Sequence, residues 1–406
     1  MKRFFQIAAI IAVTVIAKSC SSEETPVDDK KVTAKEVIIN YAKIVHQNYL
    51  DSYNSAVTMQ NAITAFTTTP TQENLDKAKK AWLTAREFYG QTEAYRESDG
   101  PIDTSSNAWS INNEGQMNAW PLDEGYIDYV TASSDSYSGY TAYKGGIIAG
   151  TETINEALLV GKNEKENDES ISTGWHAIEF LLWGQDETNP KEVKPGQRPL
   201  SDYTTDAKKE RRKTYLNVVT SILVKDLKKL ADTWAQGGQY YTVFMALPEN
   251  EALKNIVKGP FFLANEELSE ERMSKPADSD KGIDNCGQED EHSCFSDNTH
   301  RDVVTNAQGI INVIFGKYGN ISGPSFYDLV KQKDETSAAT LKAKADEMMT
   351  AINKIDQSAK NNVPFDLLLL RESITSPGIV IQGAQSLKTL GNHISASATV
   401  INISVK

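Results

Sequence analysis

The chain has 406 residues, which is long enough for two domains or one large one. Its 55 acidic residues outnumber its 42 basic ones, so the formal net charge is −13. This balance argues against nucleic acid as a partner and against charge-driven binding to an anionic surface, because both are bound by basic patches. It is compatible with a cationic ligand.

Residues 1–20 predict a lipoprotein signal peptide. Lys2 and Arg3 form a basic start, and residues 4–17 form an apolar run that is too short for a comfortable membrane span. The run leads to Cys20, which we expect to be the lipid-bearing first residue of the mature protein, although Lys18 is unusual in such a cleavage site. An ordinary secretory signal with a chance cysteine is the alternative.

Residues 21–34 are polar and charged, and predict a flexible tether. The tether begins with Ser21-Ser22-Glu23-Glu24, which is similar to the acidic tags that send some lipoproteins to the outer face of the outer membrane. We therefore expect an outer-membrane lipoprotein that is exposed on the cell surface. A periplasm-facing protein is the alternative.

Helical periodicity covers most of the remaining chain. Apolar residues recur every three or four positions over 35–66, after residue 72, over about 144–160 and through 174–184. Beyond a proline-rich segment, the same pattern covers 215–234, 248–273, 299–317, 335–357 and 377–397. Gly259-Pro260 predicts a kink or a break. The nearest approach to a strand is the tail 399–403.

These patterns predict an all-α protein made of helical bundles. The segment 185–201, with three prolines and several charges, is the best linker candidate. We therefore expect two tandem bundles, an N-terminal one over 35–188 and a C-terminal one over 189–406. Such a pair is compatible with an internal duplication, although the two halves share little residue-level similarity.

The most informative stretch is Gly174-Trp175-His176-Ala177-Ile178-Glu179. His176 and Glu179 are three residues apart, so on a helix they share a face. A neutral imidazole beside a carboxylate can share a metal ion or act as an acid/base pair. The surrounding residues are mostly apolar, which makes charge costly unless it is paired. The alternative is that the two side chains only hydrogen-bond each other where the helix packs.

Three other segments are rich in polar groups, and each alone is a weak signal. They are Arg86–Arg96, Asn118–Glu124, and Glu266–Met273 with Glu289–Thr299. An acidic run such as 289–291 is most often a solvated loop, and Asp297 or Asn298 can simply cap the 299–317 helix.

Besides Cys20, the chain has only Cys286 and Cys294, eight residues apart in one polar loop. In an oxidising compartment two nearby thiols favour a disulfide. A metal-binding thiolate pair is the alternative, although zinc-binding cysteines are usually spaced more closely.

Taken together, these segments resemble the imelysin family and, within it, the iron-regulated lipoproteins. The matching residues are Gly174–Glu179, which fit the family's Gly-x-His-x-x-Glu, then Ala119–Glu124, and Glu271-Arg272-Met273 followed by Glu289–Thr299. The resemblance extends from about residue 35 onward. It implies two helical bundle-like domains with a site between them near the His motif, a cell-envelope location, and a link to iron acquisition. Members of the family have also been called peptidases.

Two functions follow from this resemblance. The first is a lipoprotein that binds a metal ion or an iron complex, since carboxylates and one histidine suit iron. The alternative is a metallopeptidase of the imelysin type, but zinc hydrolases show His-Glu-x-x-His or its inverse, and here Phe180 follows Glu179. A third possibility is a surface adhesin or haem binder, for which no residue marks an axial ligand.

We expect the metal to be held by His176 and Glu179 together with carboxylates from other segments: Glu93, Asp123 and Glu271. Arg96 and Arg272 would balance or orient these acids, because buried like charges repel. No residue is assigned a catalytic role. The sequence leaves open which metal binds, and whether it binds as a free ion or a chelate. An envelope transport partner is compatible with the expected location.

Overall fold

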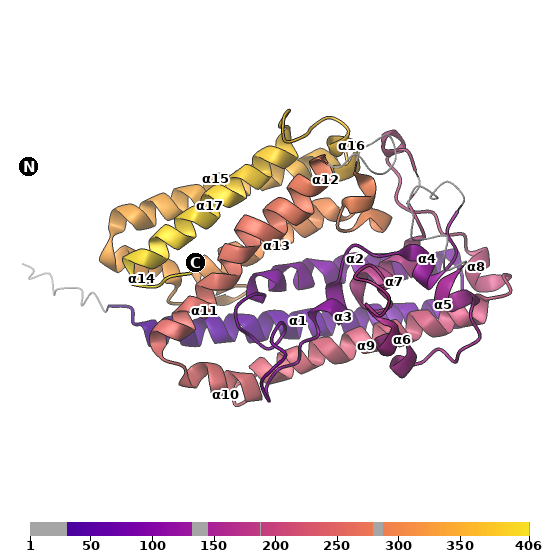
Figure 1. Cartoon of the computed structure of the whole chain (residues 1–406), viewed down its shortest axis with the longest axis horizontal. Coiled ribbons are helices and arrows are strands. Elements are labelled where there is room, and N and C mark those ends of the chain that lie inside the picture. Colours follow the sequence, from indigo (N-terminus) through magenta and orange to yellow (C-terminus); the bar gives the residue numbers. More distant parts are fainter. Residues whose placement is uncertain (1–30, 132–144, 187, 279–286, 406) are drawn as a thin grey trace, which may run out of the picture. The chain divides into compact units, whose positions relative to one another are not determined.

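The computed structural model describes residues 31–131, 145–186, 188–278 and 287–405 (Figure 1). Val32–Lys406 form one compact unit. The predicted signal peptide with Cys20, most of the tether, and Cys286 lie outside the described residues. Cys294 itself is buried. Lipidation at Cys20 and the Cys286–Cys294 disulfide therefore stay predictions.

The predicted all-α class is confirmed (Figure 1). Helices up to the predicted linker are α1 (Ala34–Thr68), α2 (Gln72–Tyr89), η1 (Gly90–Tyr95), α3 (Glu114–Asn118), α4 (Glu124–Ile127), α5 (Gly146–Ala149), α6 (Glu156–Lys162) and α7 (Gly174–Trp183). They are followed by η4 (Pro190–Glu192), α8 (Ser201–Thr204), α9 (Lys209–Trp234), α10 (Gln239–Ala246), α11 (Glu249–Phe262), η5 (Leu263–Ser274) and α12 (Lys275–Asp278).

The last part of the chain contains η7 (Gln288–Asp290), η8 (Cys294–Ser296), α13 (Thr299–Phe315), α14 (Phe326–Lys333), α15 (Glu335–Lys360), α16 (Phe365–Leu369) and α17 (Ile379–Val400). Two short strands, β1 (Lys317–Tyr318) and β2 (Ile321–Ser322), pair antiparallel after α13, a hairpin that the sequence patterns did not indicate. The tail is no strand, because α17 continues through Val400.

The long helices begin where local chemistry favours it. A capping box closes the start of α1, since the Thr33 side chain accepts from the Glu36 N–H while Glu36 accepts from the Thr33 N–H. At α2 the cap is Thr71, whose hydroxyl accepts a hydrogen bond from the Asn74 N–H.

Helix α9 follows the predicted boundary at residues 188 and 189, yet it packs along α1, as α2 does. In the C-terminal part, α15 packs on α17 and α13, and α17 packs on η5. The division into two bundles and a duplication therefore stay predictions. The shared packing shows that the segments before and after residue 188 contribute to common cores.

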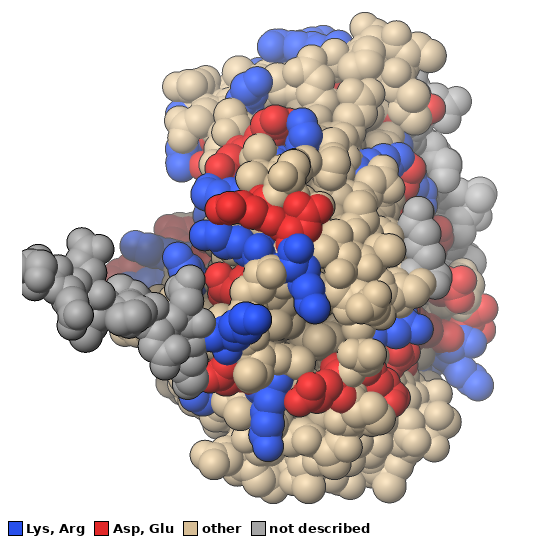
Figure 2. Space-filling model, turned by 90° about the vertical axis from the view of Figure 1, so that its left-hand side faces the viewer, with Lys and Arg blue, Asp and Glu red and all other residues tan. Residues whose placement is uncertain are grey.

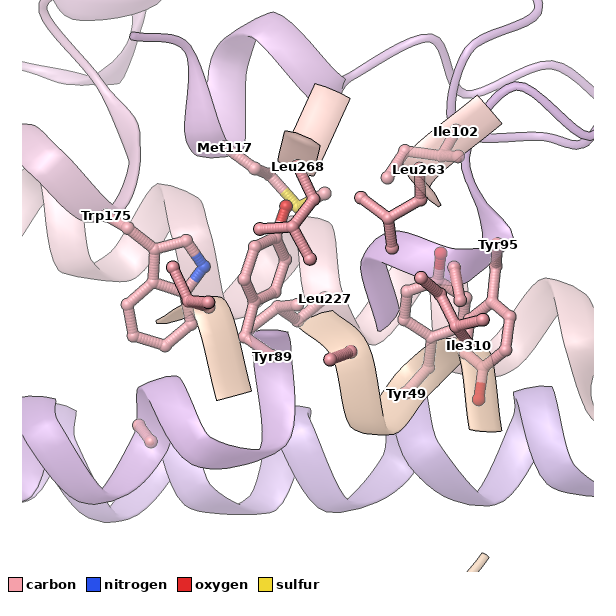
Figure 3. Packing of buried hydrophobic residues seen from close by; sticks show 14 of the residues in the cluster. Tyr49, Tyr89, Tyr95, Ile102, Met117, Trp175, Leu227, Leu263, Leu268 and Ile310 are labelled. Atoms are coloured by element: carbon pink, nitrogen blue, oxygen red, sulfur yellow. The ribbon is translucent and has the colours of Figure 1, made fainter. Parts of the chain in front are cut away.

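One such core lies under the candidate site (Figure 3). Trp175 of α7 and Tyr89 of α2 lie side by side, with ring centroids 5.3 Å apart. Met117 of α3, Leu227 of α9 and Leu268 of η5 are buried in the same cluster. This apolar layer is assembled from segments between Tyr89 and Leu268 that lie far apart in the sequence. It excludes water from the helix that carries His176.

Gly259-Pro260 does not end its helix. Instead α11 continues into η5, a wider π-helical segment. A side chain at Gly259 would place its Cβ 2.3 Å from the Ala94 carbonyl oxygen, so glycine permits a close approach of α11 to η1. The π-helical winding follows directly and carries Glu267, Glu271 and Arg272. Such windings are often found at functional sites.

No helix in the described ranges is both long and apolar enough to cross a bilayer. On the face shown in Figure 2, acidic and basic side chains are interspersed and do not form a patch of one sign. That face offers no single-sign field for steering a charged partner.

We expect Trp82→Ala to destabilise the fold by about 3–5 kcal/mol, because it empties a fully buried position. Trp82 has no exposed surface, donates from Nε1 to the Trp175 carbonyl oxygen at 3.1 Å, and packs edge-on against Trp183. Urea unfolding followed by circular dichroism measures the loss. Trp109→Ala, at a partly buried position, is the control; an equal loss in both variants would contradict the assignment of Trp82 to the core.

Candidate functional site

Helix α7 presents the His-x-x-Glu motif entirely inside the protein. Gly174, which begins the helix, has a φ of 86°, and a Cβ there would lie 2.4 Å from the Met117 carbonyl oxygen. Only glycine fits this conformation and this approach. His176 and Glu179 are fully buried, and Nδ1 of His176 lies 2.9 Å from Oε2 of Glu179. The predicted pairing of these two side chains on one helix face is thus present.

The second carboxylate oxygen of Glu179 is bound by η8. It accepts from the Ser296 N–H at 3.0 Å and from the Ser296 hydroxyl at 2.7 Å. Burial raises the pKa of Glu179 to about 8, although the Ser296 hydrogen bonds act in the opposite direction. Burial also lowers the pKa of His176 well below its ordinary value, and the neighbouring His292 lowers it further. At neutral pH the imidazole is therefore uncharged.

A second histidine completes the site. The His292 ring lies edge-on to that of His176, with centroids 4.6 Å apart. The Trp120 ring packs against His176 at 4.8 Å and lies 6.4 Å from His292. Burial, together with nearby Arg272, lowers the pKa of His292 to about 4, so this imidazole is also neutral at pH 7.

His292 is oriented by a buried carboxylate. Its Nδ1 lies 2.7 Å from Oδ2 of Asp302, which also accepts from the Ser293 hydroxyl at 2.6 Å. Arg86 binds both oxygens of Asp302, at 3.3 and 2.7 Å, and donates to Oδ1 of Asn118 at 2.7 Å. Burial by itself would raise the pKa of Asp302, but Arg86 and His292 outweigh it, and the pKa lies well below its ordinary value.

The two imidazoles thus share one pattern, in which Nδ1 faces a carboxyl group and Nε2 does not. Because Asp302 is ionised, Nδ1 of His292 carries the proton and its Nε2 keeps a lone pair, 3.5 Å from the Asn118 amide nitrogen. Nε2 of His176 is buried without a hydrogen-bond partner in the described part of the chain. A carboxyl group on the far ring nitrogen is the usual support of a metal-binding histidine.

Glu93 lies next to this pair but is neutralised by arginines. Arg272 donates to its Oε2 at 2.7 Å and to Glu267 at 2.9 Å, and Arg96 approaches Glu93 at 3.4 Å. The Asn118 amide, 3.4 Å from Oε1 of Glu93, links this ion-pair network to His292. Burial opposes ionisation, but Arg272 and Arg96 prevail and lower the pKa of Glu93 to about 2.

A cavity of about 270 Å³ opens at this network. His292, Asn118 and Trp120 line it on the side of the histidine pair, and Arg96 and Arg272 line it on the side of Glu93. The rest of its charged lining is Lys275 and six acidic residues: Glu114, Glu164, Asp168, Glu267, Glu271 and Asp290. His292 is therefore the histidine of the pair that lines the cavity.

The structure places the predicted site residues in three locations: around the histidine pair, at the rim of the cavity, and away from the cavity. His176, Glu179, Glu93, Arg96 and Arg272 are brought together around the histidine pair and its ion-pair network. Their roles as metal ligands or binding residues stay predictions.

Glu271 lies at the rim of the cavity, exposed, and forms an ion pair with Lys275 at 3.3 Å. Asp123 does not line the cavity. It caps α4 by accepting from the Tyr126 N–H at 3.2 Å. Burial raises the pKa of Asp123 to about 7, although the backbone N–H groups of Tyr126 and Gly125 act in the opposite direction. The geometry therefore accounts for Asp123 as a helix cap.

Sequence reasoning did not assign His292, Asp302 or Arg86, although His292 and Arg86 fall within the polar segments it singled out. In the sequence Asp302 is an acid in the first turn of a helix, which is common because the helix dipole favours it, and its burial became visible only in the structure. Across the described ranges, no three His, Cys, Asp or Glu side chains form a group that is ready to hold a metal ion. The histidine pair offers two donors.

Comparison with known proteins assigns the family. The imelysin family model matches residues 45–375. The chain belongs to the imelysin family. The iron-regulated protein A of Synechococcus elongatus is 28% identical over 142 residues, which cover 33% of this chain and 38% of that protein. The match thus spans well under half of that relative's length.

Two solved structures share the fold. A structure described as a "putative iron-regulated protein A precursor" from Parabacteroides distasonis superimposes with a TM-score of 0.64 at 18% identity, covering 91% of this chain and 97% of that one. An imelysin-like protein from Psychrobacter arcticum gives a TM-score of 0.62 at 14% identity, with 93% and 98% coverage. At these identities the likeness concerns the fold.

We expect Glu93 to contribute to the loss of folding stability at low pH. Its folded-state pKa of about 2 lies below the ordinary value of 4.5, so its stabilisation is present above pH 4.5 and is lost as the pH falls toward 2. Glu93→Gln should cost about 3 kcal/mol at pH 7, since Arg272 is left buried without its strongest partner. The free energy of unfolding of this variant should also fall less steeply than that of the wild type as the pH drops from 4.5 to 2.

Thermal melts of both proteins between pH 2 and 7 measure this effect. The matched control is Glu73→Gln, which removes an exposed ion pair with Lys77 that solvent screens, so it should leave the melting curve nearly unchanged. A fall in Glu93→Gln as steep as that of the wild type would refute the assignment.

Proposed function

We propose that this imelysin-family protein is a cell-envelope lipoprotein that binds a metal ion, with iron favoured, or a small iron complex at the His176–His292 pair. The observation that carries the proposal is the orientation of the two neutral imidazoles. Asp302 and Glu179 face their Nδ1 atoms, and this leaves the Nε2 atoms as the available donors. The names of two relatives link the family to iron regulation.

The donor chemistry fits this cargo. Imidazole nitrogen together with carboxylate oxygen suits iron and similar divalent cations. A cation at Nε2 of His176 would leave Nδ1 as the proton-bearing atom, with Glu179 as an ionised acceptor. Because Glu179 would otherwise hold a proton, binding is expected to release one. The Ser296 hydrogen bonds stabilise the ionised form.

Two protein donors satisfy only part of an iron coordination sphere, so the remaining positions would come from the cargo or from the acids of the cavity. Glu114 and Glu267 line the cavity with His292. Burial raises the pKa of Glu114 to about 7, although Arg96 beside it acts in the opposite direction, so this carboxyl can ionise near neutral pH. A chelate that carries its own oxygen donors also fits this arrangement.

The metallopeptidase alternative requires a zinc site with three protein ligands and an open position. Neither zinc-hydrolase motif is present in the sequence. The alternative predicts metal-dependent cleavage of an unfolded protein substrate that is lost in Glu179→Gln. Finding that activity would replace the binding proposal with an enzymatic one.

The binding proposal predicts that His176→Ala and His292→Ala each weaken iron binding by about a hundredfold or more, while Glu179→Gln weakens it by about 10- to 100-fold. Isothermal titration with ferrous salt under anaerobic conditions, and with ferric citrate, measures the affinities. His393→Ala on α17 is the control and should bind as the wild type does. Wild-type protein that binds neither form of iron would exclude the proposal.

Thermal melts of the same variants separate binding from a purely structural role. If the histidine pair only fastened segments together, His176→Ala and His292→Ala would lower the melting temperature and leave no binding to lose. Because both histidines are buried, both substitutions are expected to lower the melting temperature in either case. The result that supports the binding role is iron binding by the wild-type protein that is lost in variants that still unfold cooperatively.

For the envelope location, we expect a labelled fatty acid to mark the wild-type protein and not Cys20→Ala, because a basic start and an apolar run lead directly to that cysteine. Equal labelling of both proteins would contradict lipidation at Cys20. Protease accessibility on intact cells then distinguishes a surface-exposed protein from a periplasm-facing one. A transport partner at the envelope would be sought by crosslinking the lipidated protein.

A further inference from the structure

Asn118 lies between the histidine pair and the Glu93 ion-pair network, and the proposed function gives it no role. It is the last residue of α3 and is 3% exposed. It lines the cavity together with His292 and Trp120. A species that enters the cavity and reaches Nε2 of His292 therefore comes next to the Asn118 amide.

Arg86 fixes the orientation of this amide. Nη1 of Arg86 donates to Oδ1 of Asn118 at 2.7 Å, and Asp302 binds the same guanidinium at 2.7 and 3.3 Å. Nδ2 of Asn118 therefore faces Oε1 of Glu93, at 3.4 Å, and Nε2 of His292, at 3.5 Å. Turning the amide over would set its NH₂ group against the guanidinium, which has only donors. Asn118 thus presents N–H groups, and not its oxygen, to the histidine.

These N–H groups have the capacity for a better acceptor. Ordinary N–H···O hydrogen bonds are about 2.9–3.0 Å long between heavy atoms, and both contacts of Nδ2 are longer. A poorly satisfied donor is costly when it is buried. An oxygen atom brought into the cavity next to His292 would accept from Nδ2.

Three acids close to the site are engaged by arginines. Glu93 and Glu267 bind Arg272 at 2.7 and 2.9 Å. Glu114 lies 3.2 Å from Arg96. Among the described residues, no three His, Cys, Asp or Glu side chains form a group that is ready to hold a metal ion. The oxygen ligands of a cation at the histidine pair are therefore expected to come from the cargo itself.

A bare cation and a chelated one meet the Asn118 amide differently. The N–H end of an amide dipole is positive, so it repels a bare cation at Nε2 of His292 and attracts an oxygen atom that the cation carries. The cavity of about 270 Å³ is several times the ~30 Å³ that one water molecule occupies, so it also has room for an organic chelator.

The charge of the cavity limits the kind of chelator. Six acids line it, against three basic residues, Arg96, Arg272 and Lys275. This excess of negative charge disfavours a strongly anionic complex. Ferric iron bound by two singly charged hydroxamates keeps a net positive charge. The two hydroxamates supply four oxygen ligands and leave two octahedral positions for the two imidazoles.

We propose that Asn118 selects the cargo of the histidine pair. The site accepts iron that brings its own oxygen ligand, which receives a hydrogen bond from Nδ2 of Asn118, and it prefers an oxygen chelate without net negative charge over the hydrated ion. This inference rests on the proposed function, because it specifies what the same site binds. A coordinated water offers the same acceptor as a chelator oxygen, and the two probes below distinguish them.

The test compares two iron species on the mature full-length chain by calorimetric titration. One is ferrous salt under anaerobic conditions, and the other is ferric iron with two equivalents of acetohydroxamate. The wild type should bind the chelate about tenfold or more tightly than ferrous iron. Asn118→Ala should weaken chelate binding by about 10- to 100-fold, because it removes a donor to the ligand, and should not weaken ferrous binding.

Asn118→Asp is the sharper variant, because it puts a carboxylate oxygen of similar size in place of the N–H donor. Ferrous binding should tighten by about tenfold or more, since a charged ligand is added beside two imidazoles, and the preference for the chelate should be lost. Loss of a purely structural residue would not tighten binding. Asn54→Asp, the same chemical change at an exposed position of α1, is the control and should bind both species as the wild type does.

The outcomes separate this inference from the proposed function. Wild-type protein that binds neither species would exclude both. Wild-type protein that binds ferrous iron as tightly as the chelate, or an Asn118→Asp variant without tighter ferrous binding, would overturn only the role of Asn118. Weaker ferrous binding in Asn118→Ala would identify a coordinated water as the oxygen and contradict the preference for a chelate. If Asn118→Asp does not fold, unchanged chelate binding in Asn118→Ala would overturn the inference by itself.

Discussion

The buried ion pair between Arg86 and Asp302 is the interaction on which the candidate site depends. It joins α2 to α13 across 216 positions of sequence, and both side chains are almost wholly shielded from water. Without Arg86, burial would favour the protonated form of Asp302, and the carboxylate that orients His292 would be lost. The same guanidinium holds Asn118 between His292 and Glu93.

Around this pair, the protein compensates buried acids in different ways. Glu93 has Arg272 and Arg96, and Asp128 has Arg198 and Arg212 at 2.9 and 2.6 Å. Ion pairs of this kind offset the free-energy cost of burying a charged carboxylate, and they leave no carboxylate oxygen available to bind a ligand.

Glu179 is different, because its partners are a neutral imidazole and a serine. Burial raises its pKa to about 8, so at neutral pH it holds a proton that a bound cation would displace. The contrast between satisfied and unsatisfied acids within one fold is what separates structural carboxylates from candidate ligand-binding ones.

The sequence by itself determined the helices and the paired motif, because those features depend on neighbours within a few residues. The 3.6-residue period predicted α1, α9, α13, α15 and α17, and the spacing of His176 and Glu179 placed both side chains on one face of α7. Local rules were less informative in two places. The 144–160 pattern forms two short helices, α5 and α6. Gly259-Pro260, where we expected a kink or a break, lies in α11, which continues without a break into the π-helical η5.

Only the tertiary structure decided which distant groups meet. His292 reaches His176 across 116 residues, since 292 − 176 = 116, whereas Asp123, expected at the site, caps α4. The meeting of the two histidines depends on how α7, η8 and α13 pack, and packing is set by the complementarity of whole surfaces. The Asp123 cap is a local hydrogen bond to the Tyr126 N–H. Charge compensation is decided at the same level, because whether an acid is paired or left open depends on which arginine the fold places beside it.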